Sequence, residues 1–257
     1  MKRLLALLIS LIAISAEAAI IKKPLEYNLA GKKYEGYIAY DDSVKGPRTG
    51  VLVTHDWMGI TDRTREKVEE LASLGYVGFA VDVYGKGVRP ASADEASKLS
   101  GSLKKDRTAL RIRMQQGLKV LREQAQVDKA KLAAIGYCFG GTAVLELARA
   151  GADVKGIVSF HGGLDSLKPA DAKNIKGKVL ALHGADDPFV PAADLAAFED
   201  EMRKAKVDWQ LVKYGNAVHS FTEKTAGDDP SKGAAYNAEA DRRSWMAFKD
   251  FMKEIGL

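Results

Sequence analysis

Short apolar runs alternate with longer stretches of mixed polarity along almost the whole chain, and this alternation restricts the possible folds more than any other sequence feature. Parallel strands buried on both faces are near-continuous apolar runs, whereas the helices that cover them repeat apolar residues at helical spacing. The runs expected to be strands are residues 51–53, 77–83, 132–135, 156–160, 179–182 and 209–212. Strands that alternate with helices build a mainly parallel sheet, so we expect a doubly wound α/β fold with helices on both faces, in a single domain.

The segments between these runs have the residue patterns that predict helices. The expected helices are residues 61–74, 107–124, 140–150, 192–204 and 234–255. Thr61 is a suitable N-cap for the first of them and Gly75 a suitable stop. Residues 27–40 predict an opening hairpin. Residues 88–105 have a weaker pattern, typical of either a lid or a short helix.

The N-terminus has the pattern of a secretory signal peptide. Two basic residues precede the apolar run 4–14, and residues 16–18 read Ala-Glu-Ala, a cleavage signal. An uncleaved membrane anchor is the alternative, but the apolar run is shorter than the about 20 residues that span a bilayer. We predict a signal at residues 1–18 and a mature domain at residues 19–257, secreted or periplasmic and without stable membrane association.

Charge and cysteine content narrow the function. The net charge of +5 is spread along the chain without a Lys/Arg block, so no nucleic-acid partner is expected. A monomer is the favoured oligomeric state. The single cysteine, Cys138, has no disulfide partner within the chain. In an exported protein such a thiol needs either burial or a chemical role.

The segment Gly136-Tyr137-Cys138-Phe139-Gly140 is the sharpest motif in the sequence. It follows an expected strand and opens an expected helix, which is the nucleophile-elbow arrangement with cysteine in place of the commoner serine. Glycines two residues before and after the nucleophile let strand and helix approach, and the positive end of the helix favours a thiolate. A dinucleotide-binding glycine turn is the alternative, but the G-x-G-x-x-G spacing is absent.

A nucleophile elbow predicts an acid and then a histidine, each on a loop after a later strand. Asp186 and Asp187 compete for the acid; we prefer Asp187 because Pro188 stiffens the loop behind it. Both also fit a turn or a helix N-cap. His219 follows the last expected strand. The other histidines precede the acid and break the order: His55, His161 and His183.

The chemistry of such a trio assigns a role to each residue. His219 would accept the proton of Cys138 and later protonate the leaving group, while Asp187 would hold the imidazole in the right tautomer. The tetrahedral intermediate needs donors for its oxyanion. The backbone N–H groups of Phe139 and Trp57 are the expected donors.

These motifs together resemble the dienelactone hydrolase family. The resemblance spans most of the mature chain and is carried by residues 55–59, 82–86, 136–141, 187–191 and 219–221. It implies an α/β-hydrolase fold, a catalytic triad of Cys138, His219 and Asp187, a small ester or lactone as substrate, and no metal or organic cofactor. The best-known members open the lactone ring of dienelactone to maleylacetate.

Three positions depart from the family pattern. Asp56 stands where the family has a glutamate that pairs with the resting thiol, and it is one methylene shorter. Lys86 replaces an arginine that binds the substrate carboxylate, which keeps the charge but loses the bidentate fork. Glu223 replaces a second such arginine and reverses the charge. The resemblance therefore implies the fold and the triad, but it does not imply dienelactone as the substrate.

Other residues near these motifs have less specific signals. Trp57 and Phe139 are expected to line an apolar pocket, although Trp57 fits the core equally well. His161 fits either a substrate-binding or a structural role. Four cations are expected on solvated helix faces: Lys104, Lys105, Arg111 and Arg113.

The leading functional prediction is a hydrolase that cleaves a small ester, lactone or thioester through a covalent acyl-enzyme on Cys138. A peptidase or acyltransferase would use the same scaffold and the same trio. A third alternative is a catalytically silent α/β-hydrolase that binds a ligand or senses oxidants, because an activated thiol oxidises readily.

Overall fold

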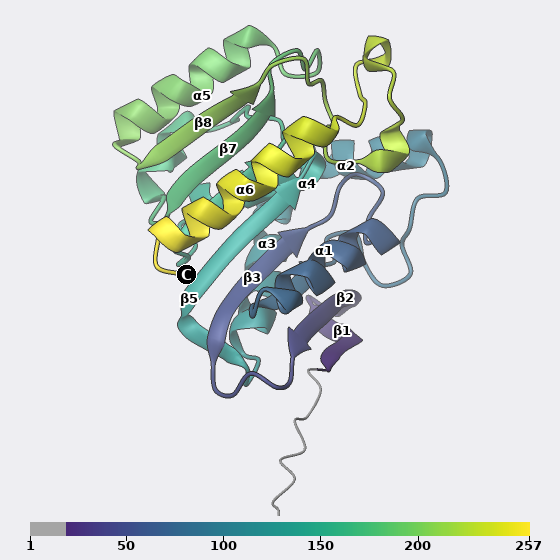
Figure 1. Ribbon diagram of the computed structural model, residues 1–257, viewed down its shortest axis with the longest axis vertical. Helices are drawn as coiled ribbons and strands as arrows, with labels where there is room; N and C mark the ends of the chain where they lie inside the picture. The colour runs from purple at the N-terminus through teal and green to yellow at the C-terminus, as the bar shows by residue number, and fades with distance from the viewer. Residues whose placement is uncertain (1–18) are drawn as a thin grey trace, which may run out of the picture.

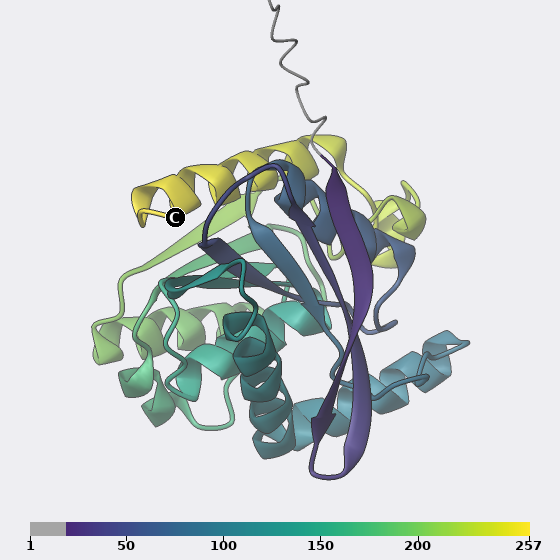
Figure 2. The ribbon, with the colours of Figure 1, turned by 90° about the horizontal axis from the view of Figure 1, so that it is seen from below.

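The computed structural model describes residues 19–257, so the predicted signal at residues 1–18 lies outside the described residues. Eight strands form one sheet in the order β1-β2-β4-β3-β5-β6-β7-β8 (Figure 1). The strands are β1 Ile20–Leu29, β2 Lys32–Asp41, β3 Arg48–Thr54, β4 Val77–Val81, β5 Val127–Tyr137, β6 Gly156–Phe160, β7 Lys178–Gly184 and β8 Trp209–Tyr214. From β4 to β8 neighbouring strands are parallel, whereas β1 and β2 are antiparallel and form a hairpin along one edge (Figure 2).

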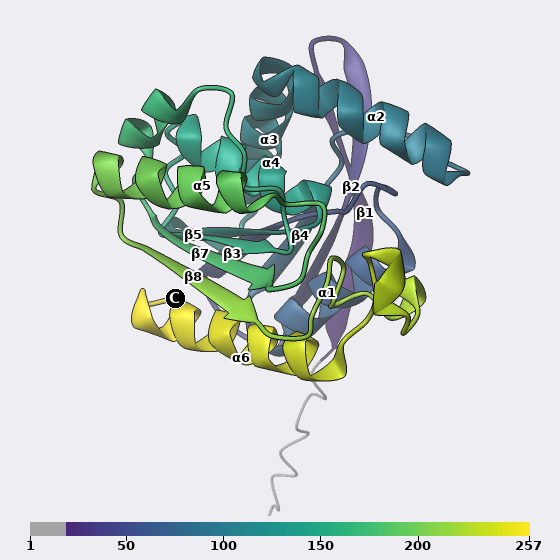
Figure 3. The same cartoon turned by 90° about the horizontal axis from the view of Figure 1, so that it is seen from above.

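Helices cover both faces of this sheet. They are α1 Asp62–Ser73, α2 Ala93–Lys105, α3 Arg107–Arg122, α4 Phe139–Arg149, α5 Ala192–Ala205 and α6 Ala238–Glu254, with short 3₁₀ turns at Pro169–Asn174, Lys224–Ala226 and Pro230–Lys232. Figure 3 shows α1 and α6 on one face and α3, α4 and α5 on the other. The sheet has a hydrophobic core on each face, and successive side chains of β3 point into one or the other. Val51 and Val53 pack towards α1 and α6, and Leu52 packs towards α3 and α4. The predicted α/β-hydrolase fold in one domain is confirmed.

The predicted strands and helices are present in the structure, although several of their bounds differ, and residues 88–105 contain a helix, one of the two structures that their pattern allowed. Residues 88–105 contain α2, which begins after Ser92; its side chain accepts a hydrogen bond from the Glu95 N–H. The last helix begins at Ala238 instead of residue 234, because the Asn237 side chain caps it at the Ala240 N–H. The residues just before it pair with the backbone of His219 instead.

A network of buried charges fixes the end of α4 against α5. Arg149 has a fully buried side chain, and its guanidinium donates to both carboxylate oxygens of Glu201 at 2.9 and 2.7 Å. It also donates to Glu146 at 3.0 Å, which in turn accepts from Arg111 at 2.8 Å. Arg111 therefore belongs to an ion-pair network, and the prediction of a solvated face was wrong for it. Arg113 also departs from that prediction, because its guanidinium donates to the Val83 carbonyl.

Candidate active site

Cys138 occupies the sharp turn between β5 and α4. Its backbone has φ 53° and ψ −116°, in a region that residues other than glycine rarely adopt. Such a conformation costs of order 1–3 kcal/mol and persists only where the surrounding structure enforces it. Here the Cys138 N–H donates to the Phe160 carbonyl at 3.0 Å, which ties the turn to β6. The turn presents the sulfur at the carboxyl edge of the sheet.

The two glycines of the motif are required by close backbone contacts. A Cβ on Gly136 would lie 2.0 Å from the carbonyl oxygen of Gly140, inside any allowed contact. A Cβ on Gly140 would lie 2.3 Å from the carbonyl oxygen of Thr54 at the end of β3. The strand before the cysteine and the helix after it therefore approach more closely than side chains would allow.

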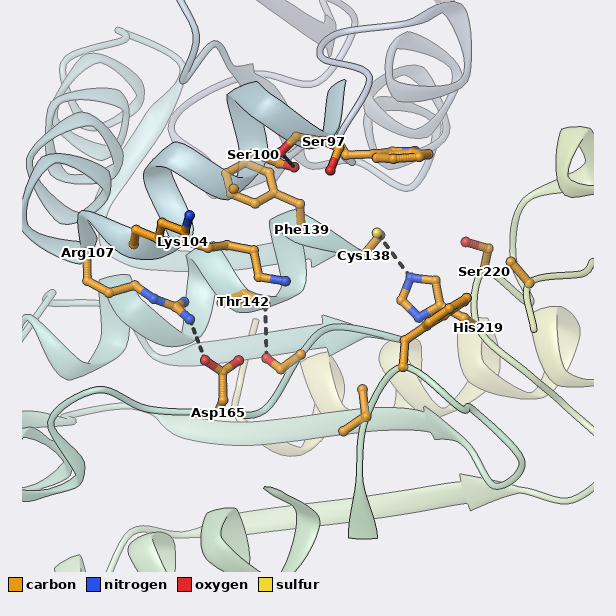
Figure 4. A pocket seen from close by; sticks show the side chains of 17 residues that line it. Ser97, Ser100, Lys104, Arg107, Cys138, Phe139, Thr142, Asp165, His219 and Ser220 are labelled. Atoms are coloured by element: carbon orange, nitrogen blue, oxygen red, sulfur yellow. Dashed lines mark hydrogen bonds and ion pairs between the residues drawn. The ribbon is translucent and has the colours of Figure 1, made fainter. Parts of the chain in front are cut away.

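The structure brings together the three residues that the chain order selected. The Cys138 Sγ lies 3.1 Å from His219 Nε2 (Figure 4). On the other side of the ring, His219 Nδ1 lies 2.8 Å from Asp187 Oδ2. Asp187 follows β7 and His219 follows β8, so both loops lie at the same sheet edge as the turn of Cys138. The neighbouring Asp186 is exposed and makes no side-chain hydrogen bond with another residue of the described chain.

Backbone contacts hold the acid and the imidazole in place. The second oxygen of Asp187 accepts the Phe189 N–H at 2.8 Å, so the carboxylate cannot rotate freely. The His219 N–H donates to the Gly233 carbonyl at 3.1 Å, and the His219 carbonyl accepts from Ala235 at 3.0 Å. The segment before α6 thus clamps the histidine loop by two main-chain bonds.

The protonation of His219 follows from its surroundings. Burial lowers the pKa of this imidazole, but hydrogen bonds to Asp187 and Cys138 and the charges of both partners outweigh burial and raise the pKa to about 10. His219 therefore holds a proton throughout the neutral range.

His161 lies behind the cysteine and is fully buried. Its Nδ1 faces the Cys138 N–H at 3.2 Å, and its Nε2 lies 2.8 Å from the Thr222 hydroxyl. Burial, first, and the neighbouring His219 charge keep the pKa of this imidazole well below its usual range. His161 is absent from the cavity lining, so the structure favours the structural role over the substrate-binding one.

A cavity of about 680 Å³ opens onto Cys138 and His219. Trp57, Phe139 and Phe189 contribute aromatic surface to it, and Trp57 keeps 36% of its surface exposed, so it is not a core residue. Phe139 is the first residue of α4, where the backbone N–H has no acceptor within the helix. The loop of Trp57 is held by the Tyr84 hydroxyl, which donates to the Trp57 carbonyl at 2.9 Å.

Two residues expected near the substrate lie elsewhere. The Lys86 ammonium pairs with Glu26 and, at 3.5 Å, with Glu35 on the edge hairpin, outside the cavity lining. Opposite charges on β1 and β2 hold it there. Asp56 accepts the Met58 N–H at 2.7 Å, and within residues 19–257 no hydrogen bond joins it to the thiol.

Asp56 instead lines a very small cavity together with Glu223, Arg63 and Tyr137. Burial raises the pKa of Glu223 to about 7, although the guanidinium of Arg63, 3.8 Å away, opposes this. Burial also raises the pKa of Asp56. The two carboxyl groups thus belong to a partly buried polar cluster and do not line the cavity at Cys138.

Sequence reasoning missed the cations that do reach the cavity. Lys104, Lys105 and Arg107 line it; the two lysines are exposed, as predicted for a solvated helix face, and Arg107 is buried. The sequence did hold one signal for this: Ser97, Ser100 and Lys104 are spaced three and four residues apart, so they share one polar face of a helix.

Within residues 19–257, no cluster of His, Cys, Asp and Glu side chains has the arrangement of a metal site. Nor does any helix there have the length and apolarity needed to cross a bilayer.

Comparison with known proteins identifies the family and agrees with the fold. The sequence model of the Dienelactone hydrolase family matches residues 34–256. The chain belongs to the dienelactone hydrolase family. Membership of this family makes the chain a hydrolase. Its relatives agree with this: a Yersinia pestis protein, provisionally assigned as a carboxymethylenebutenolidase, is 26% identical over 88% of this chain and 86% of that one.

Two solved structures resemble this dienelactone hydrolase family member over nearly their whole length. One, described as m3DLH, is 38% identical, with a TM-score of 0.89 over 92% of this chain and 99% of that one. The other is a dienelactone hydrolase-like promiscuous phosphotriesterase, P91, from metagenomic libraries. It is 40% identical, with a TM-score of 0.86 over the same shares of the two chains.

Proposed function

We propose that this family member cleaves a small ester, lactone or thioester through a covalent acyl-enzyme on Cys138. The observation that carries the proposal is the unbroken line of contacts from Asp187 through His219 to the Cys138 sulfur, at the mouth of a partly apolar cavity. A nucleophile, a base and a group that orients the base are the elements of acyl transfer.

In the first half-reaction the Cys138 sulfur attacks the substrate carbonyl, and its proton resides on His219. The carbonyl becomes a tetrahedral oxyanion. The imidazolium then protonates the leaving oxygen or sulfur, the bond to it breaks, and a thioester remains on Cys138. Asp187 stabilises the imidazolium during this step.

In the second half-reaction neutral His219 accepts a proton from water. The resulting hydroxide attacks the thioester, the carbon–sulfur bond breaks, the sulfur leaves as a thiolate, and the proton taken from water stays on His219. One water is consumed, and a carboxylic acid and an alcohol or thiol leave. The Phe139 and Trp57 N–H groups are assigned to the oxyanion in both halves; loss of one such donor typically costs ~10²–10³ in rate.

The same geometry supports a substrate other than the dienelactone of the best-known family members. Neither Lys86 nor Glu223, which stand at the family's two carboxylate-binding positions, lines the cavity. The pattern of residues 1–18 supports action in the periplasm or outside the cell.

Hydrolysis of p-nitrophenyl acetate by residues 19–257, compared with Cys138→Ser and His219→Ala, tests the proposal. Wild-type turnover with a loss of about 10³-fold or more in both variants is the expected result. Negligible turnover in all three proteins would favour the silent ligand-binding or redox-sensing alternative. Wild-type acyl transfer to added amines or alcohols instead of water would favour the acyltransferase.

The raised pKa of His219 predicts how activity depends on pH. Hydrolysis of an ethyl ester should fall as pH rises through about 10, because the imidazolium that protonates the poor ethoxide leaving group is then lost. A p-nitrophenyl ester should lack this alkaline limb, since p-nitrophenolate leaves without a proton. Initial rates of both esters between pH 7 and 10.5 measure the difference; an identical alkaline limb for both would contradict the assignment.

A further inference from the structure

The cavity at Cys138 has two chemically different ends. Cys138 and His219 lie at one end, whereas Lys104 and Arg107 lie at the other, with Phe139 and Thr142 between them (Figure 4). Lys105 also lines the cavity. The reaction described above uses only the first end, so the basic end has no role in it.

Arg107 is built into this end and is only partly paired. Its side chain is 7% exposed, and one of its nitrogens, Nη2, donates to Asp165 Oδ2 at 2.6 Å. Its Nε and Nη1 are buried and have no hydrogen-bond partner among residues 19–257. Buried donors of a charged group are costly to leave unpaired, so these two nitrogens favour an additional acceptor.

The two lysines add charge without a protein partner. Lys104 and Lys105 lie in the last turn of α2, and neither forms an ion pair with any residue of the described chain. Asp165, already bonded to Arg107, is the one carboxylate in the described lining of the cavity. Three cations against one carboxylate leave this end with an excess of positive charge.

The wall of the cavity that α2 provides is long enough to lie along an extended chain. The face of α2 that lines the cavity runs from Ser97 through Gly101 to Lys104, two helical turns or roughly 10 Å. A Cβ on Gly101 would meet nothing within 4 Å, so the middle of this wall is open space. Phe139 adds apolar surface to the lining.

The position of His219 decides which part of a substrate points towards the cations. Because His219 protonates the leaving group, that group lies on the histidine side of the reacting carbonyl. The acyl part then extends away from His219, and Figure 4 shows Lys104 and Arg107 in that direction.

We propose that the cavity takes acyl groups that end in a carboxylate, which Lys104, Lys105 and Arg107 bind while the reacting carbonyl lies at Cys138. The substrates are therefore monoesters or monothioesters of dicarboxylic acids with an apolar middle. This inference rests on the proposed function. It uses residues of α2 and α3, not the positions of Lys86 and Glu223.

Two p-nitrophenyl esters of equal carbon number test this: mono-p-nitrophenyl suberate, with a terminal carboxylate, and neutral p-nitrophenyl octanoate. Wild type should prefer the suberate by about tenfold or more in kcat/KM, the factor that corresponds to one charge-assisted hydrogen bond. Lys104→Gln/Lys105→Gln should reduce the preference to a few-fold or less, chiefly through a higher KM for the suberate.

Lys98→Gln is the matched control, because Lys98 is on the same helix, pairs with Asp94 at 2.6 Å and lies outside the cavity lining. Calorimetry with the inactive variant Cys138→Ala compares the same two kinds of ligand without turnover: monomethyl suberate, which has a free carboxylate, should bind more tightly than neutral dimethyl suberate. Equal affinity for the two, or a suberate preference that survives in the double variant, would overturn the inference. Inactivity of wild type towards every ester would instead refute the proposed function.

Discussion

Replacement of Asp187 by asparagine should lower kcat for ester hydrolysis by about 10⁴-fold while leaving the fold intact. The carboxylate accepts the Nδ1–H of His219 at 2.8 Å, which directs the other ring nitrogen to the Cys138 sulfur. An amide nitrogen at this place would favour the opposite tautomer and would no longer stabilise the imidazolium. The measurement is kcat with p-nitrophenyl acetate under saturating conditions, together with circular dichroism.

Asp186→Asn is the control for this prediction. Asp186 is adjacent in sequence and has the same chemistry, but it is exposed and makes no contact with His219. Its replacement should change kcat less than about twofold. Comparable losses in the two variants would mean that the loop, and not the Asp187 carboxylate, matters.

Replacement of Arg149 by methionine should lower the free energy of unfolding by about 3–5 kcal/mol. Methionine has a similar length, but it would leave the buried carboxylate of Glu201 without its bidentate partner, and Glu146 would keep only Arg111. An uncompensated buried charge is among the most destabilising changes that one substitution can make. Denaturant unfolding should show the loss, and Tm should fall by roughly 10 °C.

Arg203→Met provides the comparison on the surface. Arg203 is on α5, is well exposed, and pairs with Glu199 at 3.7 Å. Exposed pairs of this kind contribute little, so the change should stay within about 0.5 kcal/mol. A loss of under 1 kcal/mol for Arg149→Met would show that water or rearranged side chains compensate the carboxylates.

The fold and the trio of Cys138, His219 and Asp187 could be predicted because each depends on local pattern plus chain order. Buried strands have an apolar signature of their own, and parallel strands bring the loops at their carboxyl ends to one edge of the sheet. The glycines at 136 and 140 identified the turn, and the structure shows why: a Cβ at either would meet backbone atoms.

The substrate side of the site could not be predicted in this way, because it depends on which way side chains point after packing. Lys86 keeps the charge of the family pattern, yet Glu26 and Glu35 on the edge hairpin hold it away from the cavity. His161 follows a strand as a catalytic residue would, but lies behind the turn of Cys138. Lys104 reaches the cavity because α2 forms part of its wall, a tertiary arrangement that no local pattern contains.

The most direct test of the central claim is to trap the acyl-enzyme. Residues 19–257 are mixed with p-nitrophenyl acetate, quenched in acid during turnover, and analysed by intact and peptide mass spectrometry. Since the chain has a single cysteine, one acetyl group on the peptide that contains Cys138, formed as fast as p-nitrophenol is released, is the expected result. Acetylation of another residue at that rate, or turnover with no acyl group on Cys138 under any quench time, would contradict it.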